Sequence, residues 1–390
     1  MHATADRLAD WVSRLVQIPS VNPLHEGPSC GKPGEEAIAE AVGSYFGELG
    51  AREVEVVAVD PGRPNVYGIF TGRTDRLVVL DVHTDTVTVE NMIEDPFDGR
   101  IEDGRVWGRG AVDTKASLGV ICGLLEAWKA EGLRPQPTLL VVGTASEEAG
   151  GLLGAVRFRE WAERRELDID QMVVAEPTKC APIYGHKGGV ALEITIKGQS
   201  AHTGTPHLGR NAITAAAHVL LALDRHHQDL IAEPPKTEVG TGTLTTTMID
   251  GGIAQNVVPD RCTIKVGRRI APFEDPAVEY ERIAAIVREA CPLPVDVAPI
   301  IHFDVGTGPG SPAFYQSPDS PLIHRLAAGA GSSPAPAPFG TNALRYAGLA
   351  REMAIFGPGN IEDAHKEREW VEITDLERTA RTFTAWLEPS

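Results

Sequence analysis

The chain of 390 residues has few cysteines, no long apolar run and no excess of positive charge. Its five cysteines are scattered and form no C-x-x-C pair, which excludes a disulfide framework and fits a reducing cytoplasm. No apolar run approaches the roughly 18 residues of a membrane-spanning helix. The first twenty residues carry charges throughout, unlike a signal peptide. We therefore expect a cytoplasmic protein with no membrane partner.

Acidic residues outnumber basic ones, with 54 Asp+Glu against 36 Lys+Arg and a net charge of −18. An acidic surface repels phosphate backbones, so we expect no nucleic-acid partner. Hydrophobic residues make up 42% and charged residues 23%, values typical of globular proteins. A chain of this length can bury a full core, which excludes disordered chains and miniproteins.

Several common catalytic motifs are also missing. The sequence has no H-E-x-x-H, no G-x-S-x-G, no Walker A loop and no G-x-G-x-x-G after a strand. These absences argue against a zincin, an α/β-hydrolase, a P-loop nucleotidase and a dinucleotide-binding enzyme.

The first and last parts of the chain alternate short apolar runs with helical patterns. Continuously apolar strands separated by helices indicate a mostly parallel sheet. We therefore predict an α/β fold with a mostly parallel, twisted sheet and helices on both faces. The apolar runs are 77–82, 138–143, 172–175 and 353–356, and helical patterns fall at about 115–131, 152–165 and 374–387.

The middle of the chain has a different pattern, β-α-β-β-α-β, which is typical of a ferredoxin-like α+β domain. Its predicted strands are 190–198, 243–249, 262–270 and 295–300, and its predicted helices are 210–227 and 276–290. We predict a discontinuous catalytic domain, 1–180 with 298–390, and an inserted domain, 181–297.

Each apolar run of the predicted sheet leads to side chains that carry chemistry. They are His83 and Asp85, then Glu147 and Glu148, then Glu176, and finally His365. The functional groups of parallel sheets gather at the carboxyl ends of the strands, so these residues should share one crevice. Asp113, in a glycine-rich turn before a helix, should point into the same place.

Two imidazoles with several carboxylates suit zinc, with manganese or cobalt as alternatives. The size of the set suggests two metal ions. Asp113, Glu148 and Glu176 bring three negative charges against the four positive charges of two divalent ions. Glu147 would bring the site to neutrality.

Spacing assigns further roles near the predicted metals. His83 and Asp85 lie two apart, so in extended backbone Asp85 faces the same way and can fix the tautomer of His83. Glu147 and Glu148 are adjacent and point apart, so one can bind metal while the other acts as general base.

Each of these residues also has an ordinary structural interpretation. Asp113 alone could cap the helix that follows it. Glu147 and Glu148 alone could favour the N-terminal dipole of the next helix. The joint pattern is much less easily explained in this way.

Together, the motifs resemble those of the di-zinc aminoacylase/carboxypeptidase-type metallopeptidases, a family that includes acetylornithine deacetylase and succinyl-diaminopimelate desuccinylase. The matching stretches occur in family order over nearly the whole chain. They are DVHTDTV (81–87), DPFDGRIEDGRVWGRGAVDTKAS (95–117), TASEEAGG (144–151), VAEPT (174–178), GHKGG (185–189), GQSAHTGTPHLGRNAI (198–213), GGIAQNVVPD (251–260), FGTNAL (339–344) and GPGNIEDAHKEREWVEI (357–373).

The resemblance implies two Zn²⁺ per subunit, with Co²⁺ or Mn²⁺ as alternatives. His83 and Glu176 would hold one ion, Glu148 and His365 would hold the other, and Asp113 would bridge the two ions. The peptide bond between Asp113 and Thr114 would be cis. Asp85 would orient His83, and Glu147 would be the general base. His202 would reach the site from the partner subunit of a homodimer formed through the inserted lid domain. The implied substrate contacts are Asn256, Arg269, Gly340, Thr341 and Asn342.

The implied reaction is hydrolysis of the amide bond of an N-acyl amino acid by a metal-bridging hydroxide. Dipeptidase or carboxypeptidase activity on short peptides is the nearest alternative, and an inactive amino-acid-binding relative or a metal-free α/β protein are others. Two positions depart from the family pattern, because Gly267 and Asn342 stand where the family often has Asp. Both departures put the exact substrate in doubt rather than the chemistry.

Overall fold

The computed structural model describes residues 3–301 and 308–388, which pack into two compact units. Unit 1 comprises Met1–Tyr184, Gln316–Ala335 and Thr341–Ser390, and unit 2 comprises Gly185–Tyr315 and Pro336–Gly340. The predicted domain limits, 1–180 with 298–390 and 181–297, stay a prediction.

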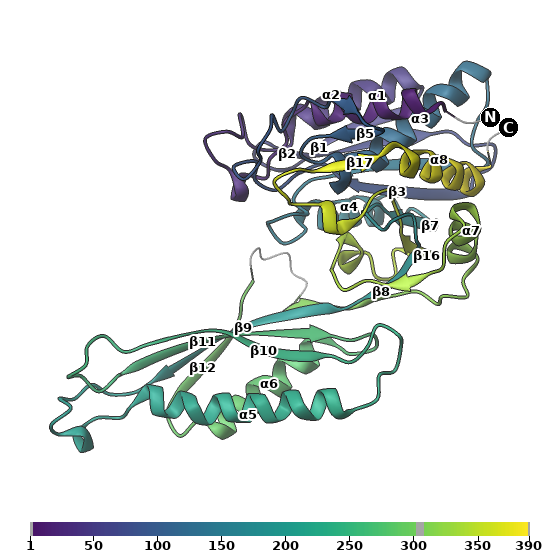
Figure 1. The fold of residues 1–390 in the computed structure, drawn as a ribbon. Coiled ribbons are helices and arrows are strands. Elements are labelled where there is room, and N and C mark those ends of the chain that lie inside the picture. Colours follow the sequence, from purple (N-terminus) through teal and green to yellow (C-terminus); the bar gives the residue numbers. More distant parts are fainter. Residues whose placement is uncertain (1–2, 302–307, 389–390) are drawn as a thin grey trace. The chain divides into compact units, whose positions relative to one another are not determined.

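Unit 1 is built on a mixed sheet whose central strands are parallel (Figure 1). Strand β3 pairs in parallel with β6 and β7, and β7 pairs in parallel with β16, while the outer pairs are antiparallel. In sheet order the strands are β1 (Glu53–Asp60), β2 (Arg63–Phe70), β6 (Thr138–Thr144), β3 (Leu77–His83), β7 (Ile169–Val174) and β16 (Ala350–Ile355). The predicted apolar runs are therefore the parallel core of the sheet.

Helices cover both faces of this sheet, as predicted. Successive side chains of a strand point to opposite faces. On β2, Gly68 faces helix α2 (Glu36–Leu49), where an added Cβ would come within 2.4 Å of Phe46. The next side chain along the strand, Tyr67, packs on Phe158 and Trp161 of helix α4, on the other face.

The helices predicted at about 115–131, 152–165 and 374–387 lie close to those positions, as α3, α4 and α8. Figure 1 shows α1, α2 and α3 together over one face of the sheet. Helix α3 is buried along almost its whole length, which explains its continuously apolar sequence. The helices are α1 (Ala5–Val16), α2 (Glu36–Leu49), α3 (Ala116–Glu131), α4 (Leu153–Arg164), α7 (Pro321–Ala330) and α8 (Ile373–Leu387).

Shorter elements complete unit 1. A small sheet has the order β17-β5-β4, and short helical turns lie before or after the main elements. They are β4 (Ile101–Glu102), β5 (Arg105–Trp107), β17 (Trp370–Glu372), η1 (Pro23–His25), η2 (Ala111–Lys115), η4 (Asn342–Arg345) and η5 (Ile361–Asp363). Strand β8 (Ile183–His186) pairs with β16 through Ile183, and the chain passes into unit 2 within β8.

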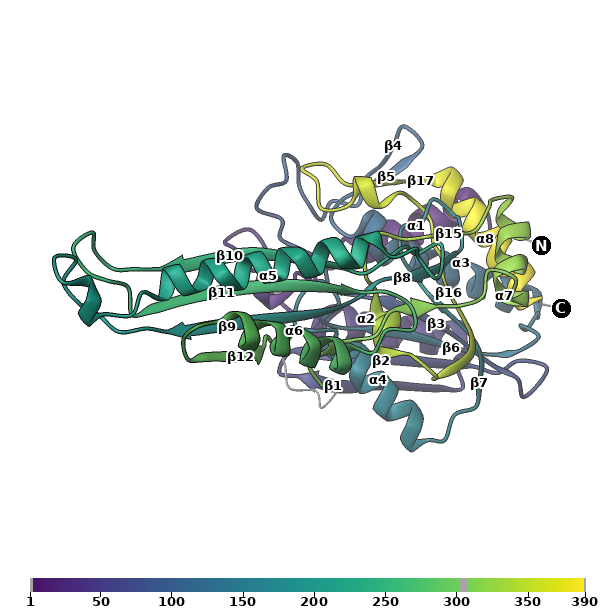
Figure 2. The ribbon, with the colours of Figure 1, turned by 90° about the horizontal axis from the view of Figure 1, so that it is seen from below.

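Unit 2 has the predicted order β-α-β-β-α-β, and its antiparallel sheet has the strand order β10-β11-β9-β12. Figure 2 shows α5 and α6 side by side on one face of this sheet. The elements are β9 (Gly188–Lys197), η3 (Pro206–Leu208), α5 (Ala212–Ala232), β10 (Thr243–Gly251), β11 (Arg261–Ile270), α6 (Pro276–Ala290) and β12 (Val295–Pro299), with the short strands β13 (Gly310–Ser311), β14 (Phe314–Tyr315) and β15 (Ala335–Pro336).

The core of unit 2 lies between the sheet and the two helices. Alternate residues of β9 are buried, including Leu192 and Ile194, and they pack with Val219 of α5 and Ile283 of α6. The other face of the sheet is not covered by a helix of this unit among the described residues. Strand β10 lies at the edge, and most of its side chains are exposed.

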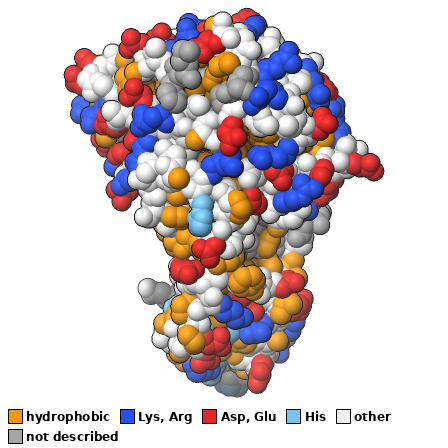
Figure 3. Space-filling view, turned by 90° about the vertical axis from the view of Figure 1, so that its right-hand side faces the viewer, with side chains coloured by type: hydrophobic (Ala, Val, Ile, Leu, Met, Phe, Trp, Pro, Cys, Tyr) orange, Lys and Arg blue, Asp and Glu red, His pale blue; other side chains and the backbone are white. Residues whose placement is uncertain are grey.

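The surface carries charges of both signs. On the face drawn in Figure 3, lysine and arginine side chains are interspersed with acidic ones. None of the helices in the described ranges combines the length and apolar character that a membrane crossing needs.

Candidate metal centre

The four parallel strands of unit 1 end at one edge of the sheet, where the predicted site residues meet. His83, the last residue of β3, pairs with Thr144 at the end of β6. At the end of β7, Val174 pairs with Ile355 of β16. The segment after β6 carries Glu147 and Glu148, the segment after β7 carries Glu176, and the segment after β16 carries His365.

Asp113 lies between the two predicted histidine ligands. One carboxylate oxygen, Oδ1, is 3.0 Å from Nε2 of His83, and the other, Oδ2, is 3.2 Å from Nε2 of His365. Asp113 belongs to the irregular turn η2, which Gly110 enters with a φ of 80°. The peptide bond from Asp113 to Thr114 is cis, as the family resemblance implies. Each oxygen of one buried carboxylate thus faces a different imidazole.

The three glutamates complete the cluster. Nε2 of His365 lies 3.1 Å from the carboxylate of Glu148. Two groups offer one ligand atom per residue with all atoms within 4.8 Å of one another. They are His83, Asp113 and Glu148, and His83, Glu147 and Glu176.

Glu176 provides an independent indication of a missing partner. Its Oε1 atom is buried and has no hydrogen-bond partner among the residues that the structure describes. A buried, unpaired carboxylate oxygen is costly in a folded protein. A cation held with His83 and Glu147 would supply that partner.

The electrostatics of the cluster favour a cation. Burial raises the pKa of Glu147 to about 8 and that of Glu148 to about 7, and the neighbouring carboxylates add to both shifts. Burial also opposes ionisation of Asp113, but hydrogen bonds from His365 and His83 outweigh it and hold the pKa of Asp113 below its usual range. Bonding to Asp113 and Glu148 raises the pKa of His365 to about 10. Positive charge between these carboxylates is therefore stabilising.

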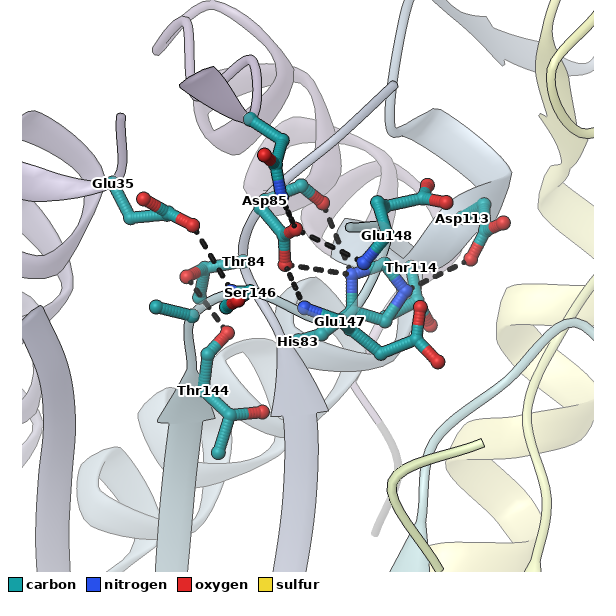
Figure 4. A network of polar contacts seen from close by, with 12 residues as sticks. Glu35, His83, Thr84, Asp85, Asp113, Thr114, Thr144, Ser146, Glu147 and Glu148 are labelled. Atoms are coloured by element: carbon teal, nitrogen blue, oxygen red, sulfur yellow. Dashed lines mark hydrogen bonds and ion pairs between the residues drawn. The ribbon is translucent and has the colours of Figure 1, made fainter. Parts of the chain in front are cut away.

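Asp85 holds the turn that carries the two adjacent glutamates (Figure 4). Its carboxylate accepts the main-chain N–H of Glu147 at 2.9 Å and that of Glu148 at 3.0 Å, and a side-chain N–H of Asn22 at 2.7 Å. Nδ1 of His83 lies 3.0 Å from the main-chain oxygen of Asp85 and 3.7 Å from its Oδ1. Asp85 therefore contacts His83 chiefly through its main chain, while its carboxylate fixes the Glu147–Glu148 turn.

A second buried carboxylate supports the same turn. Glu35 accepts the N–H of Ser146 at 3.0 Å and forms a buried ion pair with Arg63 at 2.7 Å. Sequence reasoning missed Asn22, Glu35 and Arg63. Their partners are many residues away, and nothing local distinguishes them from the other polar residues of the chain.

The predicted residues of unit 2 fall into two places. His202 pairs with Val257, and the N–H of Thr203 bonds to the main-chain oxygen of Asn256, so His202 and Asn256 are close neighbours. Arg269 and Gly340 line a separate cavity of about 380 Å³, together with Lys187.

Thr341 and Asn342 lie in unit 1 and are buried. Asn342 donates hydrogen bonds to Asp81 at 3.1 Å and to Thr144 at 2.9 Å. Its side chain thus contacts β3 at Asp81, two residues before His83, and β6 at its last residue. Whether Thr341 and Asn342 contact substrate stays a prediction. Gly267 is the other position where the family often has Asp, and an added Cβ there would meet no atom within 4 Å.

Comparison with known proteins identifies the family of the chain. The sequence model of the family described as peptidase family M20/M25/M40 matches residues 79–388, which is more than half of the chain. An acetylornithine deacetylase from Myxococcus xanthus is 30% identical over 341 residues, covering 86% of this chain and 83% of that protein.

Two solved structures illustrate the likeness of fold. The aminopeptidase PepT from Bacillus cereus has a TM-score of 0.74 and 19% identity, covering 99% of this chain and 98% of that one. The Bacillus subtilis YXEP protein, a dinuclear metal binding peptidase from the M20 family, has a TM-score of 0.67 and 15% identity, covering 98% of each chain.

Proposed function

The chain belongs to peptidase family M20/M25/M40 and is a metal-dependent amidohydrolase, and from this premise we propose that it cleaves the amide bond of N-acyl amino acids. The observation that carries the proposal is the position of the Asp113 carboxylate, which has one oxygen next to Nε2 of His83 and the other next to Nε2 of His365. The relative from Myxococcus xanthus, an acetylornithine deacetylase, supports this class of substrate.

The residues at the strand ends fit a pair of divalent metal ions. The unpartnered Oε1 of Glu176 and the shared position of Asp113 are the features that such a pair would use. In this proposal His83 and Glu176 hold one ion, Glu148 and His365 hold the other, and Asp113 bridges them. Imidazole and carboxylate ligands favour zinc, with cobalt or manganese as substitutes. The dinuclear metal binding YXEP protein, which has the same fold, supports a count of two.

When bound, the metals supply Lewis acidity that polarises the scissile carbonyl and acidifies a water molecule. Glu147 accepts a proton from this water molecule while the oxygen of the water adds to the carbonyl carbon. Glu147 then gives the proton to the amine as the C–N bond breaks, which leaves a carboxylic acid and a free amino acid. Figure 4 shows the carboxylates of Glu147 and Glu148 pointing in different directions, which supports separate roles for them.

The remaining predicted residues act on the substrate. Arg269 binds the carboxylate of the amino acid, for which the planar guanidinium is well suited, and Asn256, the neighbour of His202, reaches this carboxylate from the partner subunit. His202 donates a hydrogen bond to the developing oxyanion. Gly340, Thr341 and Asn342 are the further substrate contacts of this proposal, as the family resemblance implies.

We also propose that the chain forms a homodimer through unit 2, which serves as a lid domain. Strand β10 lies at an edge of the sheet, with β11 as its one strand partner among the described residues, and large apolar side chains on and near it are exposed. They are Ile213, Met248, Ile249 and Ile253, and Ile253 is 83% exposed. Such an edge is a ready template for pairing with a second copy.

A release assay tests the proposed activity. Purified protein is incubated with N-acetyl and N-succinyl amino acids, first as isolated, then after chelation, and then with zinc or cobalt restored. We expect amino-acid release that chelation abolishes and metal restores. Release that persists in the metal-free protein, or none with any substrate and metal, would contradict the proposal.

Dipeptidase or carboxypeptidase activity is the second candidate, because the solved structures with this fold include human carnosine dipeptidase 1 and a metallo-carboxypeptidase from Sulfolobus solfataricus. Dipeptides in the same assay separate the two. Faster cleavage of dipeptides than of any N-acyl amino acid would favour the second candidate.

A further inference from the structure

A buried ion pair lies beside the proposed metal centre and has no part in the chemistry above. Glu369, which precedes β17, is fully enclosed and pairs with Arg109 at 2.5 Å. The two residues are 260 positions apart in the sequence. Neither drew attention in the sequence, where they are one arginine and one glutamate among many charged residues.

The carboxylate of Glu369 binds the turn that carries Asp113. Its Oε1 accepts the main-chain N–H of Val112 at 3.1 Å and that of Asp113 itself at 3.3 Å. Its Oε2 accepts the bond from Arg109. One oxygen of Glu369 is thus dedicated to the main chain of the proposed bridging ligand.

Arg109 binds the segment that carries His365. Its Nη2 donates to the main-chain oxygen of Lys366 at 3.4 Å and to Oδ1 of Asn91 at 3.1 Å. Asn91 in turn donates to the main-chain oxygen of His365 at 3.2 Å. The pair therefore connects the Asp113 turn on one side with the His365 segment on the other.

A merely structural pair would hold the fold together without affecting metal binding. The contacts argue for more than a structural role, because they reach the main chain of two proposed ligands. Glu369 accepts the N–H of Asp113, and Arg109 reaches the main-chain oxygen of His365 through Asn91. Partners that fix the ligands of a metal commonly set its affinity, and their loss costs about 10-fold to 100-fold. The net charge of the pair is zero, so its effect is through geometry and not through added charge.

We propose that Arg109 and Glu369 are positioning residues that set the separation of Asp113 and His365, and through it the affinity of the centre for metal. This inference rests on the metal ligands of the proposed function. It concerns the binding of metal, so it can be tested without any substrate.

The test compares Glu369→Gln with Glu372→Gln in the full chain. Glu372 lies on β17 and pairs with Arg105 of β5 at 2.7 Å, but none of its described contacts reaches a proposed ligand. Zinc affinity is measured by competition with a chromophoric chelator, and metal content by elemental analysis after dialysis. The thermal unfolding of the metal-free proteins is recorded alongside, to separate loss of metal binding from loss of fold.

We expect Glu369→Gln to bind zinc about 10-fold to 100-fold more weakly than the unaltered chain, and Glu372→Gln to stay within about twofold. Excess zinc should restore the metal content of Glu369→Gln, because every ligand is intact. If Glu369→Gln does not fold, Arg109→Lys, which keeps the charge but loses the bonds to Lys366 and Asn91, should show the same weakening.

Zinc affinity within twofold of the unaltered chain in a folded Glu369→Gln or Arg109→Lys would overturn the proposal, as would an equal loss in Glu372→Gln. An unaltered chain that binds no zinc would overturn the proposed metal centre itself, and this inference with it. A chain that binds zinc but hydrolyses nothing would refute the proposed activity and leave the comparison of variants as decisive as before.

Discussion

Glu147 is the single residue on which the proposed chemistry depends most. Glu147→Gln keeps the size of the side chain but removes its ability to accept a proton. We expect the variant to retain its metal and to lose at least roughly 100-fold in kcat, the lower end of the contribution of a general base. Metal content by elemental analysis and kcat on the best N-acyl amino acid check this.

The exposed Glu131 offers a matched control, because Glu131→Gln makes the same chemical change at a distant surface position. Near-normal turnover by Glu147→Gln with its metal in place would remove the residue from the role of base. Loss of metal from this variant would instead make Glu147 a ligand, which its closeness to His83 and Glu176 allows.

His186 gives unit 2 a pH-dependent stability. Burial lowers the pKa of this histidine to about 4, and its ordinary value is 6.5. The unfolded chain therefore binds the proton more tightly, and stability from the neutral ring is complete above pH 6.5 and is lost as the pH falls towards 4. The shift corresponds to roughly 3 kcal/mol.

Urea unfolding of the unaltered chain and of His186→Gln at pH 7 and pH 4.5 measures this effect. The variant has no titrating group at this position, so we expect it to lose less free energy of unfolding on acidification. Equal losses in the two proteins would show that His186 is not buried in its neutral form.

The candidate site shows what single residues reveal before folding. His83, Asp113, Glu148 and Glu176 gather as the sequence predicts, because each follows a strand or a glycine-rich turn that has a recognisable pattern. Asn342 did not reveal its bond to Asp81, which is 261 positions away. Buried pairs such as this have no local pattern, since only the folded sheet brings the partners together.

At the scale of elements, periodicity was a good guide. Helices were predicted at about 115–131 and 276–290, and α3 and α6 occupy those places. The helix predicted at 210–227 continues to Ala232, because Leu230 extends the apolar face and packs against the core of unit 2. The two-residue strands, such as β13, were missed, because a pattern of alternation needs more residues than they contain.

The junction of α2, β2 and the turn after β6 depends on the ion pair between Glu35 and Arg63. Arg63→Met would leave Glu35 buried without its counter-charge, because both side chains are almost fully enclosed. We expect the free energy of unfolding to fall by about 3–5 kcal/mol, the usual cost of breaking a buried pair on one side. Urea unfolding at pH 7 measures the loss.

Arg165, which pairs with Glu53 on the surface, offers a control for this change. Arg165→Met should cost less than about 1 kcal/mol, since exposed pairs contribute little. Similar losses in Arg63→Met and Arg165→Met would mean that the Glu35–Arg63 pair does not hold the junction.

At the scale of the whole molecule, the sequence predicted the order of elements better than their assembly. The β-α-β-β-α-β pattern within a parallel α/β frame was confirmed, because each strand and helix carries its own periodicity. The return of Pro336–Gly340 to unit 2 has no such signal. The short segment Pro-Ala-Pro-Phe-Gly is compatible with many environments, and only tertiary packing selects one of them.

The proposed homodimer makes a prediction about shared sites. If His202 serves the metal centre of the partner subunit, a dimer of one His202→Ala chain and one Glu147→Ala chain contains one intact composite site. Each variant alone should be nearly inactive, and mixing them under conditions that exchange subunits should restore up to about a quarter of the normal activity, half of the dimers being mixed with one working site each. Sedimentation analysis establishes the dimer, and Ile249→Lys, at the exposed edge strand β10, should weaken it. A mixture that exchanges subunits but stays inactive would place His202 in the site of its own subunit, whereas near-normal activity of His202→Ala alone would place it outside the reaction.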